Sequence, residues 1–78
     1  MNALKEDRKM LSKQFAEAYN SLQRGVYANV RRDLIKELGW SQSTLYMRLS
    51  GARYIKEEEK TIIRTIFARY GIDVFAVT

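Results

Sequence analysis

The sequence predicts a single, compact all-α domain of four to five helices with a short C-terminal tail, and three observations lead to this class. Apolar residues recur at helical spacing through most of the chain. Proline is absent, and each of the four glycines follows such a stretch, at a place where glycine commonly ends a helix. A chain of 78 residues with 46% hydrophobic side chains has room for one core, so residues 1–78 are expected to form one domain.

The first two helices are predicted from single apolar stripes on otherwise polar segments. The first is expected from about Lys5 to Gln23, ending before Gly25, and the second from about Tyr27 to Leu38. Asn29 is a candidate N-cap of the second helix, although the pattern also allows a start one turn earlier. The apolar positions are Leu11, Phe15, Ala18, Tyr19 and Leu22 in the first helix and Tyr27, Val30, Leu34 and Leu38 in the second.

The third helix is predicted over Ser41–Ser50, with Ser41 as its N-cap and Leu45 and Leu49 facing inward. The fourth runs from about Lys56 to Tyr70 and buries Ile63, Ile66 and Phe67. Three glutamates in its first turn, Glu57–Glu59, are interpreted as a solvated run that complements the helix dipole. The tail, residues 72–78, contains Val74, Phe75 and Val77, and it either folds back on the core or pairs with a partner.

The composition excludes several classes of function. Without cysteine and histidine the chain lacks the commonest nucleophiles, general bases and metal ligands, so we expect no enzyme, no metal, no cofactor and no small-molecule ligand. The longest run without a charge, Leu38–Met47, is ten residues, whereas a membrane span needs about 20. The N-terminal residues lack the apolar segment of a signal peptide, which favours a cytoplasmic protein.

The charge distribution points to a polyanionic partner. The net charge is +5 and the pI is about 9.7, and residues 25–55 carry five basic but only two acidic side chains. Nucleic acid is the leading partner for such a surface, and ordinary solubility charge is the alternative.

A helix-turn-helix motif is predicted over about residues 28–51. The residues that define it are Leu38-Gly39-Trp40-Ser41-Gln42-Ser43-Thr44-Leu45, followed by Leu49 and Gly51. In this segment the chain resembles the phage repressor and Cro-like (lambda-repressor-like) helix-turn-helix domains. The resemblance implies sequence-specific binding of double-stranded DNA by a small prokaryotic, phage or mobile-element regulator of transcription, with homodimers on the DNA. Two residues depart from the family pattern, since Ile35 stands where a small residue is usual and Trp40 is large for the turn.

Candidate base contacts lie on the third helix. With Leu45 inward, a rotation of 100° per residue turns Gln42, Ser43, Tyr46 and Met47 to the outer or flanking faces. Glutamine pairs with adenine in the major groove, and serine bonds to several bases. The alternatives are a solvated first turn for Gln42 and Ser43, and packing on the core for Tyr46 and Met47.

Candidate contacts to the DNA backbone are basic and hydroxyl side chains around that helix. They are Arg24, Arg31, Arg32, Ser41, Thr44, Arg48 and Arg53. For any one arginine the alternative is a solvated charge. A protein-interaction module on the same scaffold remains the alternative function, and it would show weak salt dependence.

Overall fold

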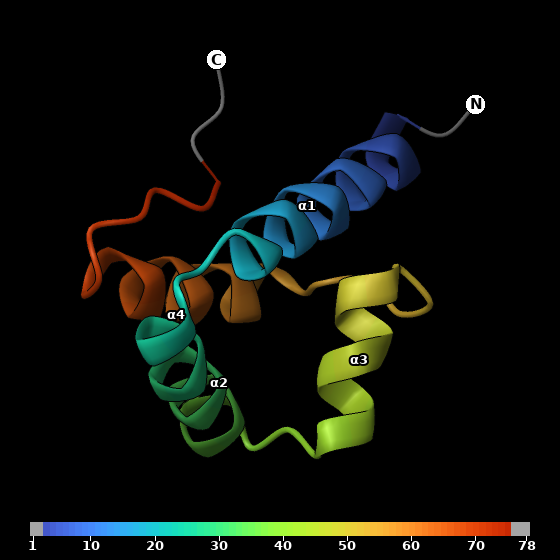
Figure 1. Ribbon diagram of the computed structural model, residues 1–78. Helices are drawn as coiled ribbons and strands as arrows, with labels where there is room; N and C mark the ends of the chain where they lie inside the picture. The colour runs from blue at the N-terminus through green and yellow to red at the C-terminus, as the bar shows by residue number, and fades with distance from the viewer. Residues whose placement is uncertain (1–2, 76–78) are drawn as a thin grey trace.

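The computed structural model describes residues 3–75, and within them the chain forms four α-helices and no strand (Figure 1). These are α1 (Ala3–Asn20), α2 (Arg24–Leu38), α3 (Gln42–Ser50) and α4 (Glu57–Ala68). The predicted all-α class is therefore confirmed. No helix in this part of the chain combines the length and the apolar character needed to traverse a bilayer.

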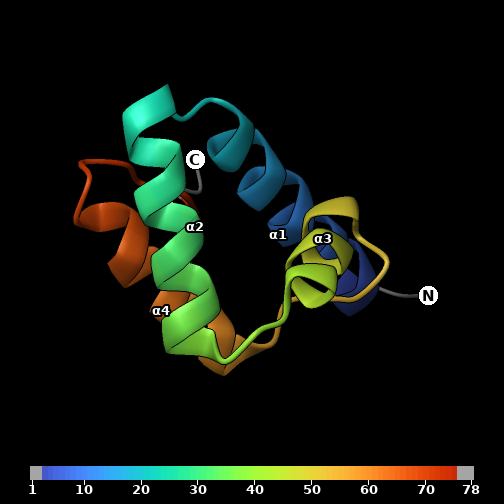
Figure 2. The ribbon, with the colours of Figure 1, turned by 60° about the horizontal axis from the view of Figure 1, so that its bottom comes forward.

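The helices pack as two pairs around an aromatic centre. α1 lies against α3, and α2 lies against α4. In Figure 2 α3 is seen nearly along its axis while α2 lies across the line of sight, so the two helices cross steeply. Phe15 of α1 joins the pairs, because its ring contacts Trp40 in the turn before α3 and Phe67 of α4, at centroid distances of 6.1 and 6.0 Å.

Three of the four glycines end helices as expected, and one does not. Gly39, Gly51 and Gly71 have positive φ, a conformation that glycine adopts without strain. Gly25 instead lies in the first turn of α2, which begins at Arg24 after Gln23 in extended conformation. The predicted N-cap Asn29 was therefore wrong, and the earlier start is correct. α1 ends without glycine, closed by the Ser21 hydroxyl donating to the Ala18 carbonyl at 2.9 Å.

The predicted core is confirmed, with two additions. Phe15, Leu34, Leu45, Ile63, Ile66 and Phe67 are fully buried, and Leu38 and Leu49 are partly buried against them. Ile55, in the loop before α4, completes the core although it belongs to no helical stripe. Val74 and Phe75 are also buried, so the tail folds back on its own core. Their side chains are therefore covered by their own chain, and Ala76–Thr78 lie outside the described residues.

A carboxylate joins three segments of the fold. Glu59 Oε1 accepts hydrogen bonds from Arg48 Nε at 3.2 Å and from the Lys56 backbone N–H at 3.0 Å. Its Oε2 accepts from Arg48 Nη2 at 3.0 Å and from Trp40 Nε1 at 3.2 Å. These four bonds use the acceptor capacity of an ionised carboxylate, and the Arg48 guanidinium also lies 5.3 Å from the centre of the Trp40 ring.

The role of Glu59 corrects the interpretation of the acidic run. Glu57 and Glu58 are exposed in the first turn of α4, as expected. Glu59 is not part of a solvated run, because its side chain is only 13% exposed and Arg48 beside it only 10%. Burial alone would raise the pKa of Glu59, but the hydrogen bonds from Arg48, Lys56 and Trp40 outweigh it and lower the pKa.

A second polar cluster joins the residues that follow the C-terminal end of α4 to α2. The Tyr70 hydroxyl donates to Asp33 Oδ2 at 2.8 Å, and Arg69 Nη2 donates to Glu37 Oε1 at 3.0 Å. The hydrogen bond from Tyr70 is the main cause that lowers the pKa of Asp33. Arg69 and Glu37 are more exposed than Asp33, so this cluster orients the helices more than it stabilises them.

We expect Glu59→Gln to lower the free energy of unfolding by about 3 kcal/mol, because the largely buried Arg48 charge would remain without its ionised partner. Glu58→Gln is the matched control in the same helical turn, and its cost should stay below about 0.5 kcal/mol. Urea unfolding of the two variants checks this difference. Equal losses for Glu58→Gln and Glu59→Gln would show that the carboxylate contributes only through the helix dipole.

We expect stability to be constant near neutral pH and to fall as the pH drops below the ordinary pKa values of 4.5 for Glu59 and 3.8 for Asp33. Both carboxyls have a lower pKa in the folded state. Protonation therefore favours the unfolded chain, and the stabilisation is lost as the pH falls through the folded values. Unfolding curves from pH 7 to pH 2 measure this, and Glu59→Gln should flatten the profile. An unchanged profile in that variant would contradict the assignment.

Candidate nucleic-acid interface

The start of α3 is set by the three-residue turn Gly39–Ser41. Gly39 adopts φ of 68° and closes α2, and Trp40 is buried beneath the turn. Ser41 then caps α3, because its Oγ accepts a hydrogen bond from the Thr44 backbone N–H at 3.1 Å. The Ser41 and Thr44 hydroxyl oxygens are also hydrogen-bonded to each other at 3.0 Å. Ser41 and Thr44, both predicted to contact the DNA backbone, thus already form hydrogen bonds that start the helix.

The outer face of α3 carries all four candidate base contacts. Gln42, Ser43, Tyr46 and Met47 are exposed on one side of the helix, with Tyr46 and Met47 at 49% and 40% exposure. Leu45 and Arg48 occupy the opposite side and are buried. Gln42 Nε2 donates to the Tyr46 hydroxyl at 3.4 Å, one helical turn away. This face therefore presents amide and hydroxyl groups beside an aromatic ring and a thioether.

The candidate arginines divide into three groups. Arg24, Arg32 and Arg53 are exposed, although Arg32 Nη2 lies 3.3 Å from Asp33 Oδ1. Arg31 is half-buried and has no ion-pair partner among the described residues. Arg48 is engaged by Glu59 and Trp40, so its guanidinium is not available to a phosphate. Leu45 and Arg48 are three residues apart and share the inner face of α3. The sequence spacing alone did not show that Arg48 would be buried.

Two tyrosines from two helices, Tyr19 and Tyr27, lie together one turn before Arg31 of α2, and sequence patterns did not identify them as a pair. The Tyr19 ring of α1 lies 4.8 Å from the Tyr27 ring of α2, measured between centroids. Burial, followed by the Tyr27 hydroxyl, raises the pKa of Tyr19, while Arg31 lowers it and Tyr46 of α3 raises it slightly further. The only sequence signal was the spacing of Tyr27 and Arg31, four residues apart and hence on one helix face.

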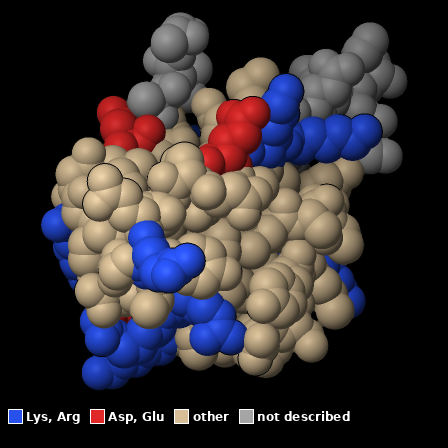
Figure 3. All heavy atoms as spheres, viewed as in Figure 1, with Lys and Arg blue, Asp and Glu red and all other residues tan. Residues whose placement is uncertain are grey.

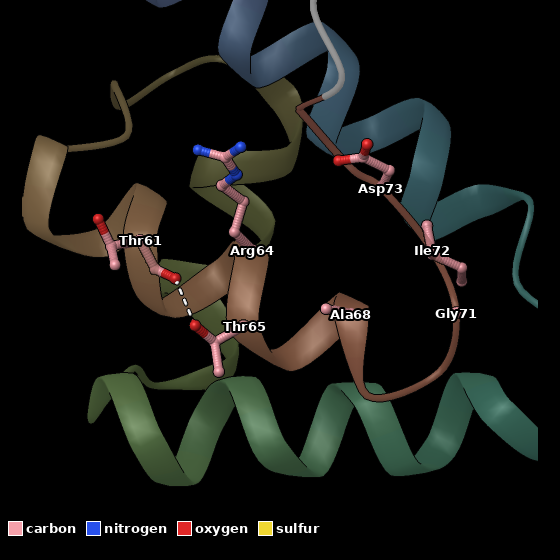
Figure 4. Close-up of a pocket in the computed structure, with 7 residues that line it drawn as sticks. All are labelled: Thr61, Arg64, Thr65, Ala68, Gly71, Ile72 and Asp73. Atoms are coloured by element: carbon pink, nitrogen blue, oxygen red, sulfur yellow. Dashed lines mark hydrogen bonds between the residues drawn. The ribbon is translucent and has the colours of Figure 1, made fainter.

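The surface charge and hollows complete the description. On the face in Figure 3 basic groups gather at the left, over α2 and α4, and at the upper right, over α1, and acidic groups lie toward the upper edge. A shallow groove of about 550 Å³ lies on the outer face of α4, between that helix and the segment Gly71–Asp73 (Figure 4). Thr65 in this groove donates its hydroxyl to the Thr61 carbonyl at 3.0 Å, and Arg64 and Asp73 lie at opposite sides.

Comparison of the chain with protein-family models, with curated proteins and with solved structures finds no match. The function proposed below therefore rests on α3 and the residues around it.

Proposed function

We propose that this protein binds double-stranded DNA sequence-specifically, with α3 in the major groove, as a small transcriptional regulator of the kind found in prokaryotes, phages and mobile elements. The observation that carries the proposal is the outer face of α3. Gln42 and Ser43 in its first turn, and Tyr46 and Met47 in its second, are all exposed on one side. Short and medium polar side chains on a projecting helix are what base-edge recognition requires.

The packing behind α3 supports the same proposal. A recognition helix must keep a constant orientation while it is held in the groove, since an error of one ångström displaces every contact. Leu45 anchors the middle of α3 in the core, and Arg48 anchors its last turn to Glu59 of α4. The exposed side chains therefore project from a rigid helix.

Exposed basic side chains lie on the loop after α3 and at the start of α2. Arg53 follows α3, and its backbone N–H donates to the Met47 carbonyl at 3.2 Å, which keeps the loop close to the helix end. Arg24 opens α2, whose first turn has no acidic residue and whose N-cap residue Gln23 makes no side-chain capping bond. An uncapped helix N-terminus with an arginine beside it attracts phosphate.

We expect Gln42→Ala to weaken binding by about 1–3 kcal/mol on the preferred site and to relax selectivity at one base pair. Arg53→Met should instead weaken all sequences alike and lower the salt slope by about one. The preferred site is obtained by selection from random duplexes, and affinities are measured by fluorescence anisotropy over a salt series. Arg64→Met, on the outer face of α4, is the matched control and should bind a duplex with a single half-site like the wild type.

Two results would contradict this function. Unchanged selectivity in both Gln42→Ala and Ser43→Ala would remove α3 as the reading element. Duplex binding that is absent in low salt would favour a protein-interaction module, for which exposed Tyr46 and Met47 are the apolar contacts.

We expect two chains on one palindromic duplex and one chain on a duplex that holds a single half-site. A single domain of this size covers few base pairs, so tight binding requires two helices about 34 Å apart. With Val74 and Phe75 buried, the outer face of α4 is the remaining candidate contact. Sedimentation of the complexes counts the chains, and Ala68→Arg should reduce the two-chain complex. One chain per palindromic duplex at saturation would refute the dimer.

A further inference from the structure

The contact between α1 and α2 holds a cluster of hydrogen-bond donors that no acidic side chain of residues 9–75 balances. Tyr19 is 2% exposed, and its buried hydroxyl makes no hydrogen bond within residues 9–75. The Tyr27 ring lies 4.8 Å from the Tyr19 ring, tilted by 54°, and Tyr27 is 36% exposed. Arg31, one turn along α2 from Tyr27, is half-buried with no ion pair in residues 9–75.

This arrangement is unfavourable for folding by itself. A buried hydroxyl without a partner loses its hydrogen bonds to water and gains none in return. A half-buried guanidinium without a carboxylate is likewise poorly compensated. By contrast, the buried Arg48 is paired with Glu59, and Arg69 is paired with Glu37. An anion with several acceptor oxygens would satisfy the donors of this cluster.

We propose that Tyr27 and Arg31 form a binding site for one phosphate group, which in the complex with DNA is a backbone phosphodiester. Arg31 supplies the charge, and the Tyr27 hydroxyl donates to a phosphate oxygen. Tyr19 is a positioning residue, because its hydroxyl faces Tyr27 and donates to the Tyr27 oxygen once that hydroxyl has turned its own proton to the phosphate. The identification of the phosphate with DNA rests on the proposed function.

The chemistry favours phosphate over a base edge. All the groups are neutral hydroxyls or a guanidinium, which donate hydrogen bonds to the oxygens of a phosphate. Contacts of this kind fix the register of a protein on the duplex without reading its sequence.

The experiment uses a pool of random 20-base-pair duplexes, because a phosphate contact does not depend on sequence. We expect Tyr27→Phe and Tyr19→Phe each to weaken binding several-fold, and Arg31→Met about tenfold with a salt slope lower by about one. Tyr27→Phe and Arg31→Met together should cost less than the product of their separate effects, since both hold one phosphate. Independent, multiplicative losses would overturn the shared site.

Stability distinguishes a binding role from a structural one. Tyr19→Phe removes an unpartnered buried hydroxyl, so its midpoint of thermal unfolding should equal or exceed that of the wild type while its DNA affinity falls. Tyr70→Phe is the matched control, since it loses the bond to Asp33 and should lower the unfolding midpoint without lowering affinity. A Tyr19→Phe variant that binds the pool like the wild type would remove Tyr19 from the site.

The failure of the site and the failure of the proposed function give different results. If the wild type binds duplexes and the Tyr27 and Arg31 variants bind equally well, the phosphate site is wrong and DNA binding stands. If the wild type binds no duplex, titration with inorganic phosphate, followed by NMR, tests the site alone. Saturable shifts of the Tyr27 and Arg31 signals that vanish in Arg31→Met would support it, and their absence would overturn it.

Discussion

The arrangement of this domain depends on the four hydrogen bonds that Glu59 accepts. They come from the turn before α3 through Trp40, from α3 through Arg48 and from the residue that precedes α4 through Lys56. Apolar packing around Phe15 brings the same segments together, but packing is not directional and tolerates small rotations of a helix. A bidentate pair between arginine and carboxylate tolerates little rotation, because two parallel bonds must keep their lengths. The orientation of α3 relative to α4 follows from this pair.

The same constraint explains which arginines are left for a partner. Arg48 is buried in its ion pair with Glu59, so the outer face of α3 has no basic side chain of its own. The nearest basic residue that follows along the chain is Arg53, in the loop after α3. The exposed face of α3 is consequently neutral, with an amide, hydroxyls, a ring and a thioether. Charge comes from α2 and the loops around it. In the proposed complex this separates the residues that read bases from those that hold phosphates, and it gives each group a distinct salt dependence.

The two departures from the usual helix-turn-helix pattern find a physical account in the core. The large Trp40 fills the space beneath the turn, makes an edge contact with Phe15 and donates to Glu59. Ile35 is partly buried and packs against the core cluster. Tyr19 differs from Trp40 in this respect, because its buried hydroxyl makes no hydrogen bond that would stabilise the fold. Such a group is better explained by binding than by stability.

The sequence by itself determined the helices, their inward stripes and the outer face of α3, because these depend on local spacing and on the φ of glycines such as Gly39 and Gly51. It also indicated Ser41 as a cap, since capping is a contact between neighbours in the chain. The tertiary structure alone decided three matters. Glu59 became a buried partner of Arg48, eleven residues away, instead of a member of a solvated run. The tail folded onto its own core through Val74 and Phe75. Tyr19 of α1 came together with Tyr27 of α2. Each of these joins residues that no helical period relates, and their partners are selected by packing in three dimensions.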